Sequence, residues 1–298
     1  MSDGVLMSET RGTLTLPAPA KLNLFLHVTG RRPDGYHTLE SLFVPIDRGD
    51  MVTLSRRSDG VVARLRGAPG VPAEDDLAVR AARLLQKTFD VEWGATISID
   101  KRLPMGGGVG GGSSDAATVL LGLNQLWRLG LRRPVLLDLA LELGADVPFF
   151  IFGRPALAHG VGELLEPVTL PRTWYTVIVP NVRVSTALMF AAPELTRNSQ
   201  SAKIPVFSES YGRNDVQTVA VARFPEIAGC LDALQRAAPF SGARMTGSGA
   251  CVFAAFASEI AAQDALSQVM RATANGGETT GFVARALNRH PLWSFAAR

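Results

Sequence analysis

The chain has 298 residues, of which 47% are hydrophobic and 19% charged, and its formal net charge is +3. This length accommodates one large domain or two modest ones with a full core. The positive charge is weak and scattered, without a run of five Lys or Arg residues, which argues against a nucleic-acid-binding surface.

The N-terminal stretch 1–13 is polar and lacks the basic start and apolar core of a signal peptide. The longest apolar runs, 147–152 and 250–257, are far too short to cross a bilayer. We therefore predict a cytoplasmic protein with no membrane partner and no nucleic-acid partner. Cys230 and Cys251 lie in apolar runs without CxxC spacing, which predicts two buried free thiols.

Residues 20–29 alternate between two sets of side chains, which is typical of a half-buried strand. Lys21 and Asn23 share one face of it, because side chains two residues apart in a strand point the same way. The loop 30–37 follows and contains the turn signal Pro-Asp-Gly. Further strands are predicted at 38–46, 51–55 and 61–66.

A glycine-rich segment, 104–117 (PMGGGVGGGSSDAA), is the most informative part of the chain. A helix is predicted at 74–89 and a strand at 95–100 before it, and a helix at 115–129 opens at its end. Glycine N–H groups can close around an anion, and the positive end of a helix dipole adds to that attraction. The segment therefore predicts a phosphate cradle for a nucleotide. Asp115 is an awkward charge there, and we expect it to turn away from the phosphates.

Several kinds of loop are rich in glycine. A Walker A loop needs Gly-Lys-Ser/Thr, whereas Gly112 is followed by two serines. Gly106, Gly108 and Gly111 match the GxGxxG pattern of dinucleotide-binding folds, but the next helix leads to another helix rather than to a parallel strand. A flexible linker is disfavoured as well, since linkers are polar and repetitive.

A helix predicted at 134–143 leads into the sharp junction 144–148 (GADVP). In isolation, Asp146 would be interpreted as a helix N-cap, and Lys21 as a solvated charge at a strand edge. The segment 154–172, rich in Gly and Pro, is the predicted boundary between two halves of the chain.

The second half has its own order of elements. It begins with a strand at 173–180 and then an exposed, poorly ordered insertion at 191–212. The remaining elements are helices within 213–238, strands at 242–246 and 250–256 around a tight glycine turn, a helix at 258–271 and a strand at 281–287. This β-α-β-β-α-β order is that of the ferredoxin-like split unit.

Taken together, these motifs resemble those of the GHMP small-molecule kinases. The phosphate loop of that family reads Pro-x-x-x-Gly-Leu/Val-Gly-Ser-Ser-Ala-Ala, and 104–117 is similar to it with an additional glycine pair. The segments 18–23 and 244–253 and the junction around Asp146 also resemble motifs of the family.

The resemblance implies an α+β fold with two domains. Residues 1–162 would form an N-terminal ATP-binding domain like ribosomal protein S5, and residues 163–298 a C-terminal ferredoxin-like domain. The long glycine loop and the Asp-Gly-Tyr-His sequence at 34–37 are similar to one branch of the family. That branch phosphorylates, with ATP, the 2-hydroxyl of 4-diphosphocytidyl-2-C-methyl-D-erythritol in the non-mevalonate route to isoprenoids.

The resemblance also implies the roles of individual residues. Lys21 and Asp146 would be catalytic, with ATP as co-substrate and Mg²⁺ on ligands that the sequence leaves unknown. The ATP phosphates would be bound by the glycine loop, that is by Pro104, Met105, Gly106, Gly107, Gly108, Val109, Gly110, Gly111, Gly112, Ser113 and Ser114. Tyr36 and Phe190 would stack on cytosine and His37 would hydrogen-bond its edge. The full set of expected substrate-binding residues is Asn23, Tyr36, His37, Thr186, Phe190, Gly247, Ser248 and Gly249.

Two alternatives stay open. One is another GHMP kinase, acting on a small alcohol that carries no nucleotide. The other is a nucleotide-binding regulator on the same scaffold, which the loss of Lys21 or Asp146 would have favoured. We expect the small-molecule cytidylyl substrate as partner, and a monomer or a weak homodimer.

Overall fold

The structure is a computed structural model that describes residues 8–10, 12–201, 212–274 and 278–297. Within these ranges two β-sheets form the framework. The first has the spatial order β1 (Ser8–Thr10), β2 (Thr13–Arg31), β3 (His37–Arg57), β5 (Gly94–Asp100) and β4 (Val62–Arg66), with β6 (Ala156–His159) on β3 and β7 (Leu164–Pro167) on β6. The second has the order β11 (Thr280–Arg285), β8 (Trp174–Val179), β10 (Val252–Phe256) and β9 (Arg244–Met245).

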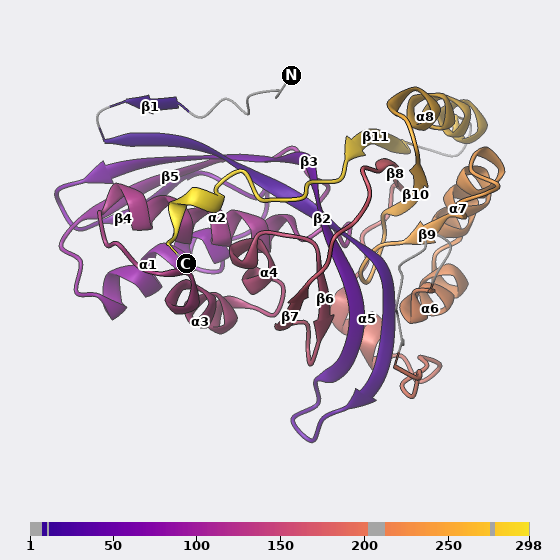
Figure 1. The fold of residues 1–298 in the computed structure, drawn as a ribbon, viewed down its shortest axis with the longest axis horizontal. Helices are drawn as coiled ribbons and strands as arrows, with labels where there is room; N and C mark the ends of the chain where they lie inside the picture. The colour runs from indigo at the N-terminus through magenta and orange to yellow at the C-terminus, as the bar shows by residue number, and fades with distance from the viewer. Residues whose placement is uncertain (1–7, 11, 202–211, 275–277, 298) are drawn as a thin grey trace.

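Two groups of helices accompany the two sheets (Figure 1). The first group packs against one face of the first sheet and shares a hydrophobic core with it. It consists of α1 (Leu77–Thr88), α2 (Gly111–Leu126), α3 (Arg133–Leu143) and α4 (Val147–Phe152). The second group lies beside the second sheet and consists of α5 (Thr186–Ala191), α6 (Asp215–Arg223), α7 (Pro225–Ala237) and α8 (Glu259–Thr273). A short 3-10 helix, η1 (Trp293–Phe295), follows the last strand.

The ferredoxin-like order predicted for the second half is confirmed. Each neighbouring pair of strands in the second sheet is antiparallel. Helices α5, α6 and α7 connect β8 to β9, and α8 connects β10 to β11. Both cysteines are buried and free, as their apolar surroundings predicted.

Strand β2 is longer and more deeply buried than its alternating pattern predicted. Leu14 and Leu16 pack in the core with the first group of helices, whereas Leu22 and Leu24 pack in a core shared with the second sheet. The opposite face is buried too, since Lys21 is only 3% exposed. The prediction of a half-buried strand is therefore wrong, because both faces of β2 are covered by other parts of the fold.

The two halves of the chain are interleaved at their ends. The segment 154–172, predicted as the link, contains the hairpin β6–β7, which extends the first sheet. The last residues return to the first helices, where the Asn124 side chain donates a 3.0 Å hydrogen bond to the Phe295 carbonyl. The change from one sheet to the other falls between β7 and β8, and the division at residues 162 and 163 stays a prediction.

Two other predicted boundaries need correction. Helix α2 begins at Gly111 rather than at Asp115, directly after a left-handed residue, Gly110, with φ of 72°. The described part of the predicted insertion is mostly exposed, as expected, but Ala192 and Leu195 are buried and pack it against the fold. Residues 202–211 of that segment lie outside the described residues.

We predict that Gly49→Ala destabilises the fold. Gly49 lies on β3 opposite Pro19, and a Cβ atom there would come within 2.3 Å of the Ala18 carbonyl oxygen. Backbone atoms cannot move aside cheaply, so the free energy of unfolding in urea should fall by about 2 kcal/mol or more. The control is Gly229→Ala on the exposed side of α7, where a Cβ meets nothing within 4 Å and should stabilise by about 0.5–1 kcal/mol. Equal stabilities of the two variants would contradict the prediction.

Candidate active site

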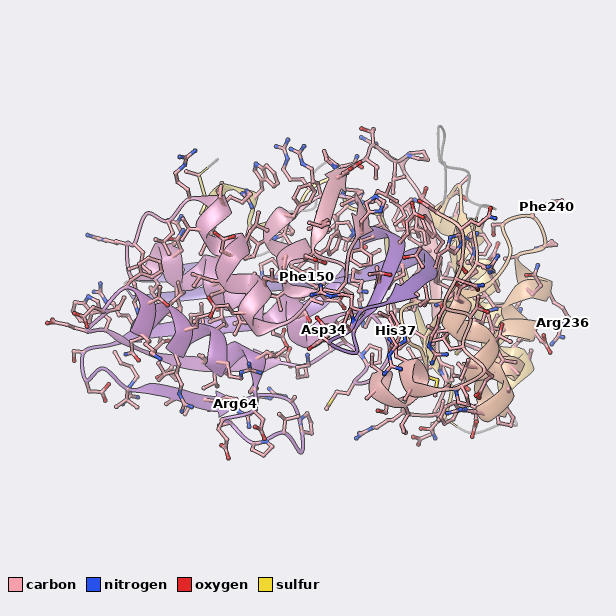
Figure 2. All side chains as sticks on the ribbon, turned by 90° about the horizontal axis from the view of Figure 1, so that it is seen from below. Asp34, His37, Arg64, Phe150, Arg236 and Phe240 are labelled. Atoms are coloured by element: carbon pink, nitrogen blue, oxygen red, sulfur yellow. The ribbon has the colours of Figure 1, made fainter. Side chains whose placement is uncertain are left out.

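A cavity of about 1070 Å³ lies between the two halves of the fold. Its lining includes every residue predicted for catalysis, ATP binding and substrate binding except Ser114. In Figure 2, Asp34 and His37 at the tip of the β2–β3 hairpin lie in the middle of the molecule, between the two groups of helices. The cavity is at the upper end of the size range for single small-molecule sites, so it has room for two substrates.

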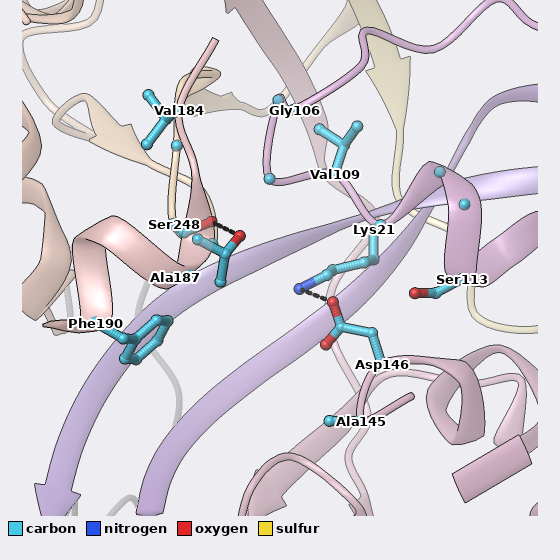
Figure 3. Close-up of a pocket in the computed structure, with 18 of the residues that line it drawn as sticks. Lys21, Gly106, Val109, Ser113, Ala145, Asp146, Val184, Ala187, Phe190 and Ser248 are labelled. Carbon is cyan, nitrogen blue, oxygen red and sulfur yellow. Dashed lines mark hydrogen bonds and ion pairs between the residues drawn. The ribbon is translucent and has the colours of Figure 1, made fainter. Parts of the chain in front are cut away.

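Lys21 and Asp146 meet inside this cavity (Figure 3). The Lys21 ammonium nitrogen lies 3.4 Å from Oδ2 of Asp146. Asp146 occupies the N-cap position of α4, but its side chain makes no capping hydrogen bond. Its side chain is 38% exposed, so the carboxylate is open to a ligand. The two simpler interpretations, a helix cap for Asp146 and a solvated edge charge for Lys21, do not describe these residues.

The Lys21 side chain is held in place by its neighbours. Its Nζ donates a 2.6 Å hydrogen bond to Oδ1 of Asn23, and the Asn23 amide nitrogen donates to the Ser41 hydroxyl at 2.8 Å. The ammonium also lies 4.5 Å from the ring centroid of Phe43, a cation–π contact. The backbone N–H of Lys21 donates to the Val109 carbonyl at 2.9 Å, at a register shift of β2. Asn23 therefore lines the cavity while its amide positions Lys21.

The glycine loop presents free N–H groups at the start of α2. The first N–H groups of a helix have no partner within it, and no side chain caps α2 at Gly110. The carbonyl groups of Gly106 and Gly107 point elsewhere, since they accept hydrogen bonds from the backbone of Ala250 and Cys251 at 3.2 and 3.1 Å. The loop is thus docked on the β9–β10 turn of the other half, and the uncapped helix end is suited to an anion.

The two serines that follow the loop differ in position. The Ser113 hydroxyl points across the cavity toward Lys21 and Asp146 (Figure 3). Ser114 is buried, and its hydroxyl donates a 2.6 Å hydrogen bond to the Pro19 carbonyl. The Ser114 hydroxyl therefore joins α2 to β2, so the prediction that Ser114 binds the ATP phosphates does not fit its position.

Asp115 is turned toward a buried lysine. Lys101 Nζ lies 2.8 Å from Oδ2 of Asp115 and also pairs with Asp50, whose other oxygen accepts the backbone N–H of Leu103 at 2.8 Å. Burial is the main cause that raises the pKa of Asp115 to about 7, and the charge of Asp50 adds to it against the opposing charge of Lys101. The pKa of Lys101 is also raised, by both carboxylates against the effect of its burial. The charge expected to be awkward beside phosphates is therefore neutralised locally.

Aromatic rings lie at the other end of the cavity. The rings of His37 and Phe190 have centroids 5.3 Å apart and are tilted by 38°. Tyr36, which is 64% exposed, lines the same cavity. The Thr186 hydroxyl on α5 is 2.7 Å from the Ser248 hydroxyl, which joins α5 to the β9–β10 turn. A planar base could enter between these side chains, with the Lys21–Asp146 pair further along the cavity.

Known proteins match the chain along most of its length. Family models match residues 76–154, as the GHMP kinases N terminal domain, and residues 198–275, as the GHMP kinases C terminal. A protein of Nitrosospira multiformis named 4-diphosphocytidyl-2-C-methyl-D-erythritol kinase is 52% identical over 288 residues, which cover 97% of this chain and 96% of the relative. This chain belongs to the GHMP kinase family. A relative of the same name from Thiobacillus denitrificans is 57% identical to this GHMP kinase, over 94% of the chain and 97% of the relative.

Solved structures agree with this assignment. The crystal structure of a 4-(cytidine 5'-diphospho)-2C-methyl-D-erythritol kinase has a TM-score of 0.77 and 33% identity, and covers 92% of this GHMP kinase and 99% of that chain. A homoserine kinase from Cytophaga hutchinsonii has a TM-score of 0.70 at 20% identity, over 96% of this chain and 99% of that one, which is a similarity in fold. The predicted α+β GHMP kinase fold is confirmed.

The described part of this GHMP kinase contains no cluster of three or more His, Cys, Asp or Glu side chains that could hold a metal ion. Mg²⁺ commonly retains several waters and is held by one or two carboxylates together with substrate phosphates. Asp146 and the Ser113 hydroxyl offer oxygen atoms to the cavity near the glycine loop. These residues fit a Mg²⁺ ion that arrives with ATP. None of the described helices is long and apolar enough to cross a membrane.

Three features of the site escaped the sequence-based prediction. They are the carboxylate of Asp50 beside Lys101, the cation–π contact of Lys21 with Phe43, and the side chain of Arg197 near His37. Each feature joins segments far apart in the chain, so no local pattern signals it.

We predict that Gly108→Ala disrupts the docking of the glycine loop. Gly108 has φ of +73°, and a Cβ there would come within 2.3 Å of the Thr246 carbonyl oxygen. The variant should bind an unreactive ATP analogue about a hundredfold more weakly, by calorimetry, because small displacements in such loops are costly. The control is Gly112→Ala, in the first turn of α2 with nothing within 4 Å of the new Cβ. Gly112→Ala should keep the wild-type melting temperature, whereas Gly108→Ala should lower it because of the backbone clash. A similar loss of stability in both variants would argue against the docking role.

We predict that Asp115→Asn becomes more stable relative to the wild type as the pH rises. Because the pKa of Asp115 is raised from 3.8 to about 7 in the folded state, its contribution to stability is complete below pH 3.8 and is lost as the pH rises through 7. The asparagine of the variant does not titrate, so this position contributes no pH-dependent loss of stability as the pH rises through 7. The difference in melting temperature should therefore grow by about 2–4 °C between pH 5 and pH 8.

Asp59→Asn is the matched control for that experiment. Its hydrogen bond with Arg57 lowers the pKa of Asp59 to about 2, which lies below the range tested. The melting temperature of Asp59→Asn should therefore stay parallel to that of the wild type. Parallel curves for Asp115→Asn as well would show that Asp115 does not titrate in this range.

Proposed function

We propose that this GHMP kinase transfers the γ-phosphoryl group of ATP to the 2-hydroxyl of 4-diphosphocytidyl-2-C-methyl-D-erythritol, giving the 2-phosphate and ADP. The reaction belongs to the non-mevalonate route to isopentenyl diphosphate. The observation that carries the proposal is the common cavity, which holds the Lys21–Asp146 pair, the uncapped start of α2 and the rings of Tyr36 and Phe190. The names of the full-length relatives support the same substrate.

The phosphate end of the cavity would bind ATP through backbone groups. Phosphoryl transfer requires mainly positioning and charge stabilisation from the protein. The free N–H groups at the start of α2 and the Ser113 hydroxyl can donate to phosphate oxygens. Mg²⁺ bound with ATP would neutralise part of the phosphate charge, next to Asp146.

The acceptor hydroxyl would lie between the phosphate and Asp146. The exposed carboxylate of Asp146 can accept the proton of the hydroxyl or orient it toward phosphorus. The Lys21 ammonium, fixed by Asn23, can stabilise the negative charge that the transfer spreads over phosphate oxygens. Both residues are in place before substrate binds.

The aromatic end would bind the cytidylyl group. Tyr36 and Phe190 offer ring faces for stacking, and stacking tolerates any base. Selection of cytosine therefore needs hydrogen bonds to the base edge, for which His37 is the nearby polar side chain. We further propose a cytoplasmic protein that acts as a monomer or a weak homodimer, without a nucleic-acid partner.

The alternative is a GHMP kinase for another small alcohol. Release of ADP from ATP and Mg²⁺ should be measured with the cytidylyl substrate and, separately, with mevalonate, homoserine and galactose. Turnover with the cytidylyl substrate alone is the expected result. Turnover only with another alcohol would retain the phosphate loop and Asp146 but reject the cytosine site, and no turnover with any of the four would favour the regulator.

We predict that Asp146→Asn lowers kcat by about a hundred- to ten-thousandfold, because the acceptor hydroxyl loses its proton acceptor. Binding of ATP, measured by calorimetry, should stay within about threefold of the wild type, since the amide keeps the shape of the side chain. The control is Asp138→Asn on the exposed side of α3, which should keep full activity. A wild-type kcat in Asp146→Asn would remove Asp146 from the mechanism.

A further inference from the structure

Arg197 connects two walls of the cavity. It lies after α5, and its Nε donates a 3.0 Å hydrogen bond to Nε2 of His37. Its Nη2 donates to the carbonyl groups of Phe190 and Ala192 at 3.0 and 2.6 Å, and its Nη1 to that of Leu195 at 3.1 Å. Among the described residues it forms no ion pair, so its guanidinium is used entirely for neutral acceptors around His37 and the end of α5.

The bond to His37 determines which ring nitrogen carries a proton. Arginine can only donate, and its guanidinium keeps its charge in proteins. Nε2 of His37 must therefore accept with its lone pair, and the single proton of the neutral ring is on Nδ1. The pKa of His37 is lowered by burial and then by the charges of Arg197 and Arg31, which also favours the neutral ring.

This tautomer gives His37 one donor for a ligand. Its ring lines the cavity, and the described residues supply no hydrogen-bond partner for Nδ1. The edge of cytosine offers acceptors at O2 and N3, whereas N3 of uracil carries a proton and is a donor. An Nδ1–H group directed at N3 would match cytosine and oppose uracil, whereas a ring with its proton on Nε2 would do the reverse.

The same arginine fixes the aromatic wall. The last carbonyl groups of a helix have no partner within it, and Arg197 takes up that of Phe190 at the end of α5. The rings of Phe190 and His37 are 5.3 Å apart. The Arg197 side chain thus holds both residues, since it binds the ring of His37 and the backbone carbonyl of Phe190. Figure 3 shows Phe190 directed into the cavity from α5.

We propose that Arg197 is a positioning residue for the pyrimidine base: it holds His37 as the Nδ1–H tautomer and fixes Phe190, and so selects cytosine over uracil. The inference rests on the proposed function, because it assumes that a cytidylyl group binds at this end of the cavity. Arg197 itself acts through His37 and Phe190.

The test compares Arg197→Met with Arg223→Met. Arg223, on α6, pairs with Glu194 at 2.6 Å in the same region. Arg223→Met is therefore a matched control, because it also removes one arginine but leaves the hydrogen bond to His37 intact. Arg197→Met should raise KM for the cytidylyl substrate about tenfold, the order expected for lost hydrogen bonds, and leave KM for ATP and kcat within about twofold. The preference for CMP over UMP as competitive inhibitors should fall by a similar factor. Arg223→Met should change none of these quantities.

Nitrogen-15 NMR of the histidines gives a second measurement, whose main result comes from the wild type. The chain has four histidines, and His37→Asn identifies the signal of His37. The wild type at pH 8 should show a protonated Nδ1 and an unprotonated Nε2 at His37. In Arg197→Met the two tautomers should average.

Two results would overturn the proposal. One is a wild-type His37 that carries its proton on Nε2. The other is a folded Arg197→Met variant that raises KM for ATP as much as KM for the cytidylyl substrate. If instead the wild type does not phosphorylate the cytidylyl substrate at all, the proposed function fails, and the tautomer of His37, measured by NMR, still reports separately on Arg197.

Discussion

The buried ammonium group of Lys21 is the constraint on which the rest of the site depends. Transfer of a charge from water into the interior is costly unless other groups replace its hydration. Asn23 supplies an oxygen from the same strand, Asp146 supplies a carboxylate from the start of α4, and Phe43 covers a third side with its ring. Because β2, β3 and α4 must all meet at this one nitrogen, the fold itself fixes the geometry of the proposed catalytic pair.

The glycine loop has two structural roles, one for its N–H groups and one for its carbonyl groups. Its N–H groups are left for an anion, while its carbonyl groups bind the turn between β9 and β10. A Cβ at Gly107 would lie 2.7 Å from the Cys251 sulfur, and one at Gly247 would lie 2.8 Å from the Gly108 carbonyl oxygen. The loop is therefore rich in glycine partly because the two halves of the fold approach each other there, backbone to backbone. Phosphate binding and the joining of the two halves share one segment.

The sequence predicted those features whose signals are local. The glycine loop, the Asp146 junction and the order of elements in the second half follow from spacing and composition. The burial of both faces of β2 could not be predicted in this way. An alternating pattern indicates a strand but does not show what covers each of its faces. The carboxylate that pairs with Lys21 belongs to Asp146, far along the chain. Arg197 lies 160 residues from His37 in a stretch whose composition predicted poor order. Its contact with His37 arises only from tertiary structure.

Two lysines with little exposed surface line the cavity, and their carboxylate partners suit Lys21 to the chemistry that we propose and Lys101 to a structural role. Lys101 is shared by Asp50 and Asp115, whose side chains are 0% and 4% exposed. The surplus negative charge there lies at the wall of the cavity, and the raised pKa of Asp115 lets a proton compensate it. Lys21 faces one carboxylate, and that carboxylate is open on one side. A substrate hydroxyl can therefore approach Asp146 without replacing a buried partner, whereas any ligand that displaced Lys101 would leave two carboxylates facing each other in the interior.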